Sequence, residues 1–162
     1  MREIFSSERI RFTEVSELLI PDYLRMVNDY ENVNIYLGSG QESYTEEDEV
    51  RWVREKLETN APVFSMMEKE TGDFIGNIEL MDVADGQGEL GIALTAEKQN
   101  RGYGTEAIRA LTAYAAQRMG LRRIVLRADP RNLRALHVYA KCGFREYDRT
   151  EKDVYMELVP AR

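Results

Sequence analysis

The stretch KQNRGYGTEA, residues 98–107, places a glycine on each side of a tyrosine, between an apolar run and a long amphipathic segment. Gly102, Gly104 and Ala107 fit the pattern G-x-G-x-x-A, which also describes a dinucleotide-binding turn. We call residues 98–105 the glycine loop. Two kinds of nucleotide-containing cofactor are compatible with such a loop, and the elements around it decide between them.

The chain downstream of the glycine loop predicts two helices and three strands. Apolar residues recur on one helical face between Gly104 and Met119, and Gly120 follows where a helix end favours a left-handed residue. The remaining elements are a strand ended by Pro130, a short helix ended by Gly143, and a closing hairpin. Their segments are RRIVLRADP (122–130), NLRALHVYAKCG (132–143), FREYDR (144–149) and DVYMELV (153–159).

The chain upstream predicts one strand, two helices and a three-stranded meander. In the first helix Tyr23, Met26, Val27 and Tyr30 have helical spacing, and the second helix runs from Thr45 to about Leu57. The strand segments are ERIRFTEV (8–15), APVFSMMEK (61–69), DFIGNIELMDV (73–83) and GELGIALT (88–95). The order of elements predicts one α+β sheet domain without repeats.

The predicted order of elements argues against a Rossmann dinucleotide fold. That fold needs its glycine turn directly after a strand, and an acidic residue about 20 positions later. Asp129 imitates the acid, but residues 95–100 separate the apolar strand from the first glycine, and too few strands follow. The match to the dinucleotide pattern is therefore a coincidence of spacing.

Composition limits the classes of function. A chain of 162 residues with 43% hydrophobic residues predicts a single domain over residues 1–162, and without an apolar span or signal-peptide core it predicts a cytoplasmic protein that binds no membrane. One cysteine and one histidine argue against a metal site. A net charge of −7 argues against nucleic acid and favours a cationic partner.

A longer pattern surrounds the glycine loop. Gln99, Gly102 and Gly104 fit Q-x-x-G-x-G at the start of a helix, and the next helix places Asn132 and Tyr139 on one face. Together these stretches resemble the GNAT superfamily of acetyl-CoA-dependent N-acetyltransferases. The stretches SERIRFTEV (7–15) and GNIELMDVADGQGELGIAL (76–94) resemble the subgroup of ribosomal-protein N-terminal acetyltransferases and spermidine acetyltransferases.

The resemblance implies a GNAT-like fold and a coenzyme site. The fold is a mixed, mostly antiparallel sheet of about seven strands flanked by about four helices, splayed between the fourth and fifth strands. Glycines let backbone N–H groups approach a diphosphate at a helix start, and Lys98 and Arg101 can add charge. The residues implied for acetyl-CoA are Ile92, Ala93, Leu94, Gln99, Asn100, Arg101, Gly102, Tyr103, Gly104, Thr105, Asn132, Ala135 and Tyr139.

Acetyl transfer to an amine needs a proton donor for the thiolate and an acceptor for the amine proton. A tyrosine phenol, with a pKa of about 10, stays protonated at neutral pH, and the resemblance implies Tyr139 for this role. Glu89 or Glu79 is the candidate base, and for either the alternative is a solvent-facing strand residue. His137 and Cys142, five residues apart, do not face each other on a helix, which favours direct transfer over an acyl-enzyme.

These observations predict an N-acetyltransferase that acts on a primary amine, either a small molecule such as a polyamine or a peptide N-terminus. The alternatives are a catalytically idle GNAT-like module and, more remotely, a Rossmann-type oxidoreductase. The acidic run TEEDEV (45–50) could attract a polyamine, but as a helix N-cap followed by acids it is better explained by capping. Two sheet edges, at the N-terminal strand and the C-terminal hairpin, would allow a homodimer.

Overall fold

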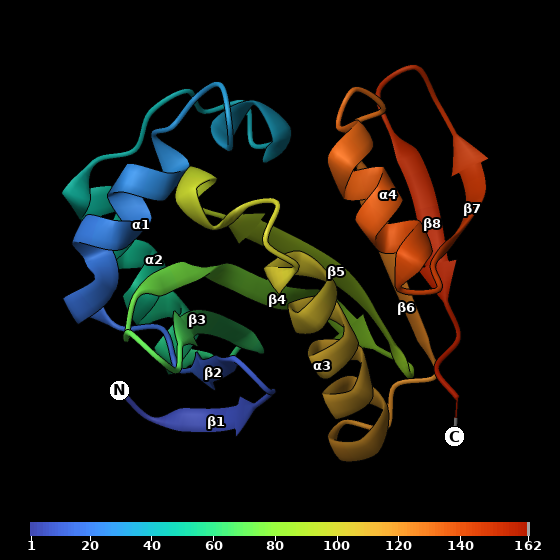
Figure 1. Cartoon of the computed structure of the whole chain (residues 1–162), viewed down its shortest axis with the longest axis horizontal. Helices are drawn as coiled ribbons and strands as arrows, with labels where there is room; N and C mark the ends of the chain where they lie inside the picture. Colours follow the sequence, from blue (N-terminus) through green and yellow to red (C-terminus); the bar gives the residue numbers. More distant parts are fainter. Residues whose placement is uncertain (162) are drawn as a thin grey trace.

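The computed structural model describes residues 1–161, which form eight β-strands and four α-helices (Figure 1). None of these helices is both long enough and apolar enough to cross a membrane. The strands are β1 (Glu3–Ser6), β2 (Ile10–Thr13), β3 (Val63–Glu68), β4 (Phe74–Ala84), β5 (Gln87–Leu94), β6 (Arg123–Ala128), β7 (Arg145–Arg149) and β8 (Val154–Leu158). The helices are α1 (Ile20–Val27), α2 (Glu46–Glu58), α3 (Tyr103–Arg118) and α4 (Leu133–Lys141).

All eight strands belong to one mixed sheet, in the order β1-β2-β3-β4-β5-β6-β8-β7. Neighbouring strands are antiparallel except β5 and β6, which are parallel and joined through α3, because a parallel pair needs a long crossover. The predicted α+β architecture, a mostly antiparallel sheet flanked by four helices, is confirmed. The ends of the sheet are β1 and β7, the N-terminal strand and one strand of the C-terminal hairpin.

The sheet has eight strands where about seven were predicted, because β1 precedes the strand at Ile10–Thr13 and pairs with its edge. Strand β1 has only four residues, too few to show an alternating pattern. Aromatic packing holds it in place: the Phe5 ring lies 4.2 Å from the Phe12 ring and 4.4 Å from the Tyr114 ring of α3, centroid to centroid. The strand therefore depends on partners that are distant in the sequence.

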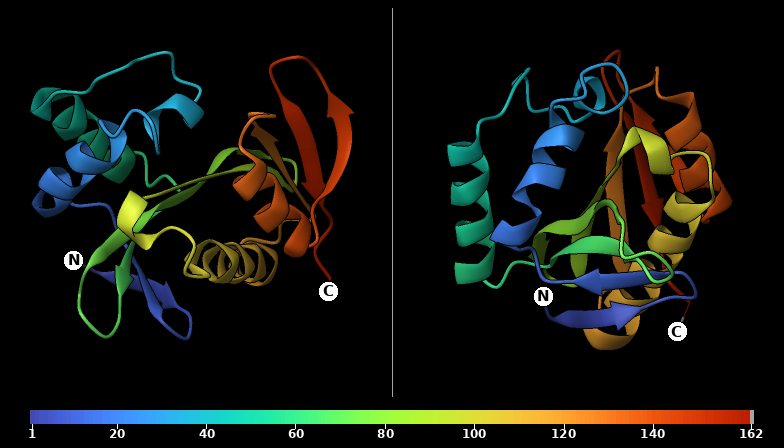
Figure 2. Two further views of the ribbon diagram at one scale, coloured as in Figure 1. Left: turned by 45° about the horizontal axis from the view of Figure 1, so that its top comes forward. Right: turned by 60° about the vertical axis from the view of Figure 1, so that its left-hand side comes forward.

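Helices cover both faces of the sheet (Figure 2). On one face α3 and α4 pack over the sheet, and Ile108 and Leu111 of α3 are fully buried there. On the other face α1 and α2 pack over β3 and β4 through Tyr23 and Val53, which are 1% and 0% exposed. The sheet therefore separates two apolar cores.

Helix α1 is shorter than its apolar spacing predicted. It ends at Val27, and Tyr30, which was expected on its buried face, is exposed. The reason is a contact with a later segment: the Asn28 side chain donates to the Tyr44 carbonyl at 3.0 Å and accepts from the Tyr44 N–H at 2.7 Å. The chain therefore leaves the helix at Asn28 to close the loop before α2.

Helix α2 begins with the capping arrangement that its sequence predicted. The Thr45 hydroxyl accepts from the Asp48 N–H at 3.2 Å, and the Asp48 carboxylate accepts from the Thr45 N–H at 2.9 Å. Acidic residues in the first turn also oppose the positive end of the helix dipole. This explains the run TEEDEV without a ligand.

Replacing Thr45 with alanine is expected to lower the free energy of unfolding by about 1 kcal/mol, because the first turn of α2 loses its side-chain acceptor. Urea denaturation monitored by circular dichroism measures this change. Thr45→Ser is the matched control, since it keeps the hydroxyl and should retain most of the stability. Equal stability of the alanine variant and the natural protein would contradict the role of the cap.

Candidate active site

The glycine loop leads into α3 and leaves backbone donors free at its start. Among the described residues, the N–H groups of Tyr103, Gly104 and Thr105 have no hydrogen-bond acceptor, because they occupy the first turn of the helix. The positive end of the helix dipole lies at the same place. This end of α3 therefore offers three amide donors to an anion.

Two positions of the loop have left-handed backbone, and one of them requires glycine. Gly102 caps α3 with a φ of 82°, and Asn100 has a φ of 61°. Gly104 differs, because its φ is ordinary and a Cβ placed on it would lie 3.6 Å from Leu94 Cδ1 and 3.7 Å from Val138 Cγ1. The bare side of Gly104 therefore faces the space between the end of β5 and α4.

The side chain of Gln99 ties the glycine loop to the end of β5. Its Nε2 donates to the Leu94 carbonyl at 3.0 Å and to the Asn32 carbonyl at 3.3 Å. The amide therefore fixes the loop relative to the strand before it and to the segment that follows α1.

Strands β5 and β6 separate beyond Glu89. They pair only through Gln87, Gly88 and Glu89, while β5 stays paired with β4 as far as Leu94. The predicted splay between these strands, the fourth and fifth of the predicted sheet, is therefore consistent with the structure. Ile92, Ala93 and Leu94 lie beyond the last pair and are half-buried. Their backbone forms an edge that β6 does not occupy.

Helix α4 carries the predicted proton donor on the α3 side of the sheet. Its N-cap is Asn132, whose Oδ1 accepts from the N–H of the half-buried Ala135 at 3.3 Å. Tyr139, one residue of the apolar core, is 8% exposed, and burial raises the pKa of its hydroxyl to about 12. The Tyr139 hydroxyl has no hydrogen-bond partner within residues 1–161. Every fully buried side-chain oxygen of these residues does have a partner, so the Tyr139 hydroxyl keeps some contact with solvent.

The two candidate bases lie on the opposite face of the sheet. Glu79 pairs with Gly91, and Glu89 pairs with Met81 two rungs away, which puts both carboxylates on one face. Glu79 is half-buried, and burial raises its pKa; the charge of Lys56 opposes this shift, and Glu89 adds a smaller increase. Arg127 lies 3.8 Å from the Glu89 carboxylate. The same face carries Ala93, which packs against the α1 and α2 core.

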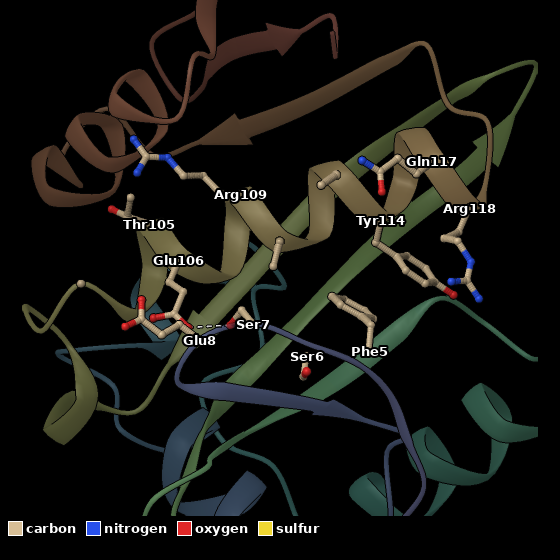
Figure 3. A pocket seen from close by; sticks show the side chains of 13 residues that line it. Phe5, Ser6, Ser7, Glu8, Thr105, Glu106, Arg109, Tyr114, Gln117 and Arg118 are labelled. Atoms are coloured by element: carbon tan, nitrogen blue, oxygen red, sulfur yellow. Dashed lines mark hydrogen bonds between the residues drawn. The ribbon is translucent and has the colours of Figure 1, made fainter. Parts of the chain in front are cut away.

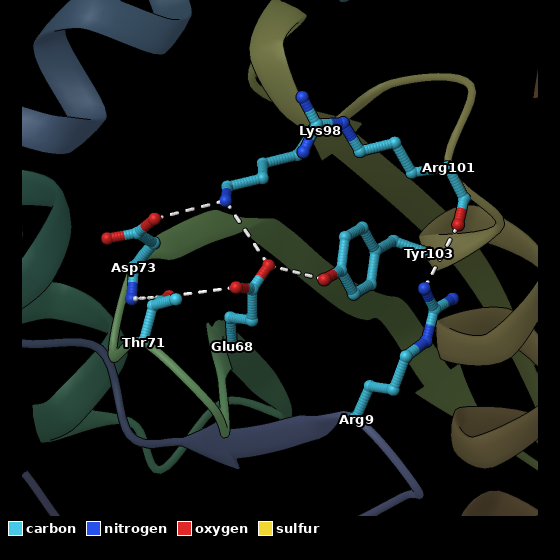
Figure 4. A network of polar contacts seen from close by, with 7 residues as sticks. All are labelled: Arg9, Glu68, Thr71, Asp73, Lys98, Arg101 and Tyr103. Atoms are coloured by element: carbon cyan, nitrogen blue, oxygen red, sulfur yellow. Dashed lines mark hydrogen bonds and ion pairs between the residues drawn. The ribbon is translucent and has the colours of Figure 1, made fainter.

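Lys98 does not add charge to the loop as the sequence suggested. Its Nζ lies 3.2 Å from Glu68 and 3.1 Å from Asp73, and the residue is 8% exposed (Figure 4). The Tyr103 side chain is also turned inward, and its hydroxyl donates to Glu68. Asn100 and Arg101 are exposed and Thr105 is half-buried. Sequence reasoning missed Glu68 and Arg9, since Glu68 reaches the loop from the end of β3 and Arg9 from the turn before β2, both far away in the chain.

His137 and Cys142 do not form a nucleophilic pair. The imidazole is exposed, whereas the half-buried thiol donates to the Thr105 carbonyl with 3.7 Å between sulfur and oxygen. Burial raises the pKa of the thiol, which favours the protonated form. Cys142 therefore lacks the activation that a nucleophilic cysteine needs.

Comparison with known proteins agrees with this geometry. Residues 9–145 match the family model described as an acetyltransferase (GNAT) domain. The chain belongs to the GNAT acetyltransferase family. A relative of this GNAT chain, the uncharacterized N-acetyltransferase YnaD of Bacillus subtilis, is 30% identical over 115 residues. The match covers 70% of this chain and 66% of YnaD, just under two thirds of that protein's length.

Solved GNAT structures share the whole architecture. An acetyltransferase of the GNAT family from Bacillus anthracis has a TM-score of 0.84 and 21% identity, covering 95% of this chain and 96% of that one. A spermidine N-acetyltransferase from Vibrio cholerae, in complex with CoA and spermine, has a TM-score of 0.81 and 17% identity, covering 93% and 95%. At these identities the likeness establishes the fold, and it confirms the predicted GNAT fold.

Proposed function

We propose that this protein transfers the acetyl group of acetyl-CoA to a primary amine by direct attack in a ternary complex. The observation that carries the proposal is the edge of β5 that β6 leaves open beyond Glu89. Its end at Leu94 lies beside Gly104, one of the three residues with free amide donors at the start of α3. An open strand edge suits an extended molecule with amide groups, and free helix N–H groups suit its diphosphate.

The residues present fit acetyl-CoA. The amides of Tyr103, Gly104 and Thr105 would hold the diphosphate, with the exposed Arg101 beside them. The backbone at 92–94 would hold the pantetheine amides as a neighbouring strand would, and Gly104 leaves room beside that edge. When bound, acetyl-CoA supplies an electrophilic thioester carbonyl and a thiolate leaving group.

The side chains around the split divide the proton transfers between two faces of the sheet. Tyr139 would donate a proton to the thiolate, because its raised pKa keeps the hydroxyl protonated across the physiological range. Glu79 would accept the proton of the amine, since a carboxylate with a raised pKa is the stronger base. The open part of the β5–β6 split would let the two groups serve one reaction from opposite sides.

The acceptor that fits best is a cationic primary amine. Two carboxylates, Glu79 and Glu89, lie on the face where the amine would enter, and the chain carries a net charge of −7. The Vibrio cholerae spermidine N-acetyltransferase, which shares this fold, forms a complex with CoA and spermine, and this supports a polyamine acceptor here. Polyamines are therefore the first acceptor class to test, together with peptide N-termini.

The test is release of CoA thiol from acetyl-CoA in the presence of polyamines, aminoglycosides, amino acids and N-terminal peptides. Turnover with one amine class, and a product whose mass rises by one acetyl group, would support the proposal. Tight CoA binding without turnover on any of these amines would favour an idle GNAT module instead.

Replacing Glu79 with glutamine is expected to lower kcat/KM by about 10²-fold, near the lower end of the range for lost acid–base catalysis. The base works deprotonated, so activity of the natural protein should fall as the pH drops through the raised pKa of Glu79. This fall, the acidic limb of the pH profile, should occur above the pH range in which a glutamate ordinarily titrates. It should disappear in Glu79→Gln. The measurement is kcat/KM against pH on the confirmed amine.

Glu89→Gln is the matched control for this experiment. It removes the other carboxylate of the same face, and the acidic limb should remain. A profile in which Glu89→Gln loses the limb and Glu79→Gln keeps it would reverse the two roles.

A further inference from the structure

We infer that Arg9 and Glu68 are positioning residues that hold the glycine loop in its anion-binding shape before the coenzyme arrives. The inference rests on the proposed function, because it concerns how the loop binds CoA. Neither residue belongs to the loop: Arg9 precedes β2, and Glu68 ends β3. They contact the loop from two directions, and no feature of the glycine motif itself indicates them.

Arg9 contacts three consecutive residues of the loop. Its Nη1 donates to the Arg101 carbonyl at 3.1 Å, and its guanidinium carbon lies 4.2 Å from the centre of the Tyr103 ring. Its Nη2 lies 3.2 Å from the point where Gly102 would carry a Cβ. The guanidinium therefore packs against the left-handed turn that begins α3.

The charge of Arg9 is already paired by α3. Its Nε donates to Glu106 at 2.7 Å, and its backbone N–H donates to the same carboxylate at 2.7 Å. Ser7 completes the site, since its hydroxyl donates to Glu106 at 2.5 Å across the groove between α3 and the β1–β2 turn (Figure 3). The charge of Arg9 is therefore neutralised by Glu106, and the guanidinium supports the loop by packing against it and by binding the Arg101 carbonyl.

Glu68 supports the loop from the other side. Its carboxylate accepts from the Tyr103 hydroxyl, from Thr71 at 2.8 Å and from Lys98 at 3.2 Å (Figure 4). These hydrogen bonds, led by the one from Tyr103, lower the pKa of Glu68 to about 2. The carboxylate thus stays charged at neutral pH and ties two residues of the loop, Lys98 and Tyr103, to β3.

These contacts matter because the loop is otherwise costly to order. It contains two left-handed residues, Asn100 and Gly102, and it must keep three N–H groups free of internal partners. A loop that is ordered beforehand loses less conformational entropy when a ligand binds. Removing the contacts of Arg9 or Glu68 with the loop should therefore weaken CoA binding without removing any group that touches CoA.

The first test compares Arg9→Met with the natural protein by calorimetric titration of CoA. The dissociation constant is expected to rise about tenfold, as loss of a charged hydrogen bond and of preorganisation predicts. Arg11→Met is the matched control. Arg11 is an exposed arginine of β2, two residues beyond Arg9; it lies 3.6 Å from Glu3 and makes no hydrogen bond or ion pair with the loop. Its affinity for CoA should be unchanged.

The salt dependence separates positioning from direct contact. A residue that binds a phosphate contributes to the slope of affinity against salt concentration, and its loss makes that slope shallower. Arg9→Met combined with Glu106→Gln removes both charges of the pair and leaves the net charge beside the loop unchanged. This double variant should keep the slope of the natural protein while shifting the whole line to weaker binding. A shallower slope would overturn the positioning role and make Arg9 a phosphate ligand.

Tyr103→Phe keeps the test decisive if Arg9→Met fails to fold. It removes only the hydroxyl that Glu68 holds, and it too should raise the dissociation constant of CoA several-fold with no change in slope. If a folded Arg9 or Tyr103 variant binds CoA with unchanged affinity, the inference is overturned while the proposed function stands. Failure of the natural protein to bind CoA would instead overturn the proposed function, and the inference with it.

Discussion

Replacing Tyr139 with phenylalanine is expected to lower kcat by about 10² to 10⁴, the range typical of lost acid catalysis, while CoA affinity and folding change little. The substitution removes one oxygen that has no hydrogen-bond partner within the described chain, so the packing of the ring can persist. Burial raises the pKa of this hydroxyl to about 12, which keeps its proton available at neutral pH. Steady-state kinetics at saturating acetyl-CoA and amine measures the effect.

A matched control and a change of acetyl donor make the Tyr139 experiment specific. Tyr147→Phe alters an exposed tyrosine of the edge strand β7 and should leave kcat unchanged. The loss in Tyr139→Phe should shrink with donors whose leaving thiol has a low pKa, because such a thiolate needs no proton. Near-normal kcat in Tyr139→Phe, with chemistry limiting the rate, would reduce Tyr139 to a core residue.

The second large effect concerns CoA binding. At about 100 times its dissociation constant, CoA should raise the free energy of unfolding by about 2.7 kcal/mol, and NAD should not raise it. Gly104→Val should abolish this gain, because the new side chain would enter the space between Leu94 and Val138. Thermal or chemical denaturation with and without each ligand measures the difference.

Gly104 is a cleaner test position than Gly102. A side chain at Gly102 would strain a left-handed residue with a φ of 82°, so loss of binding could reflect a distorted loop. Gly120→Ala is the control at the other end of α3: it should lower stability by itself, yet keep the gain from CoA. Equal stabilisation by NAD, or none by CoA, would refute the coenzyme assignment.

Local sequence patterns predicted most of the fold. Periodic apolar residues, the Thr45 cap and the left-handed glycines at positions 120 and 143 mark element ends that the structure confirms. What the patterns missed depends on distant contacts. Strand β1 forms because Phe5 stacks on Phe12 and Tyr114, and α1 stops early because Asn28 binds the backbone of Tyr44.

In the candidate site, too, local patterns were predictable and distant contacts were not. The amide donors, the Asn132 cap and the splay could be predicted, since each belongs to one motif or to one family pattern. Lys98 was misjudged because its partners lie 25 and 30 residues away along the chain. Arg9 went unnoticed as a loop contact because Arg101, whose carbonyl it binds, is 92 residues away. Charged side chains choose partners by the folded geometry, which local spacing does not specify.

The unpaired edges inside this sheet bear on aggregation. A free strand edge can template the addition of a strand from another chain, and folded proteins therefore cover or shorten their edges. Beyond Glu89 the inner edges of β5 and β6 lie within one sheet, joined at one end and flanked by helices on both faces. A foreign strand would have to wedge between two joined strands, whereas a thin flexible molecule can enter. The protein can thus keep an open backbone edge in solution without offering it to other chains.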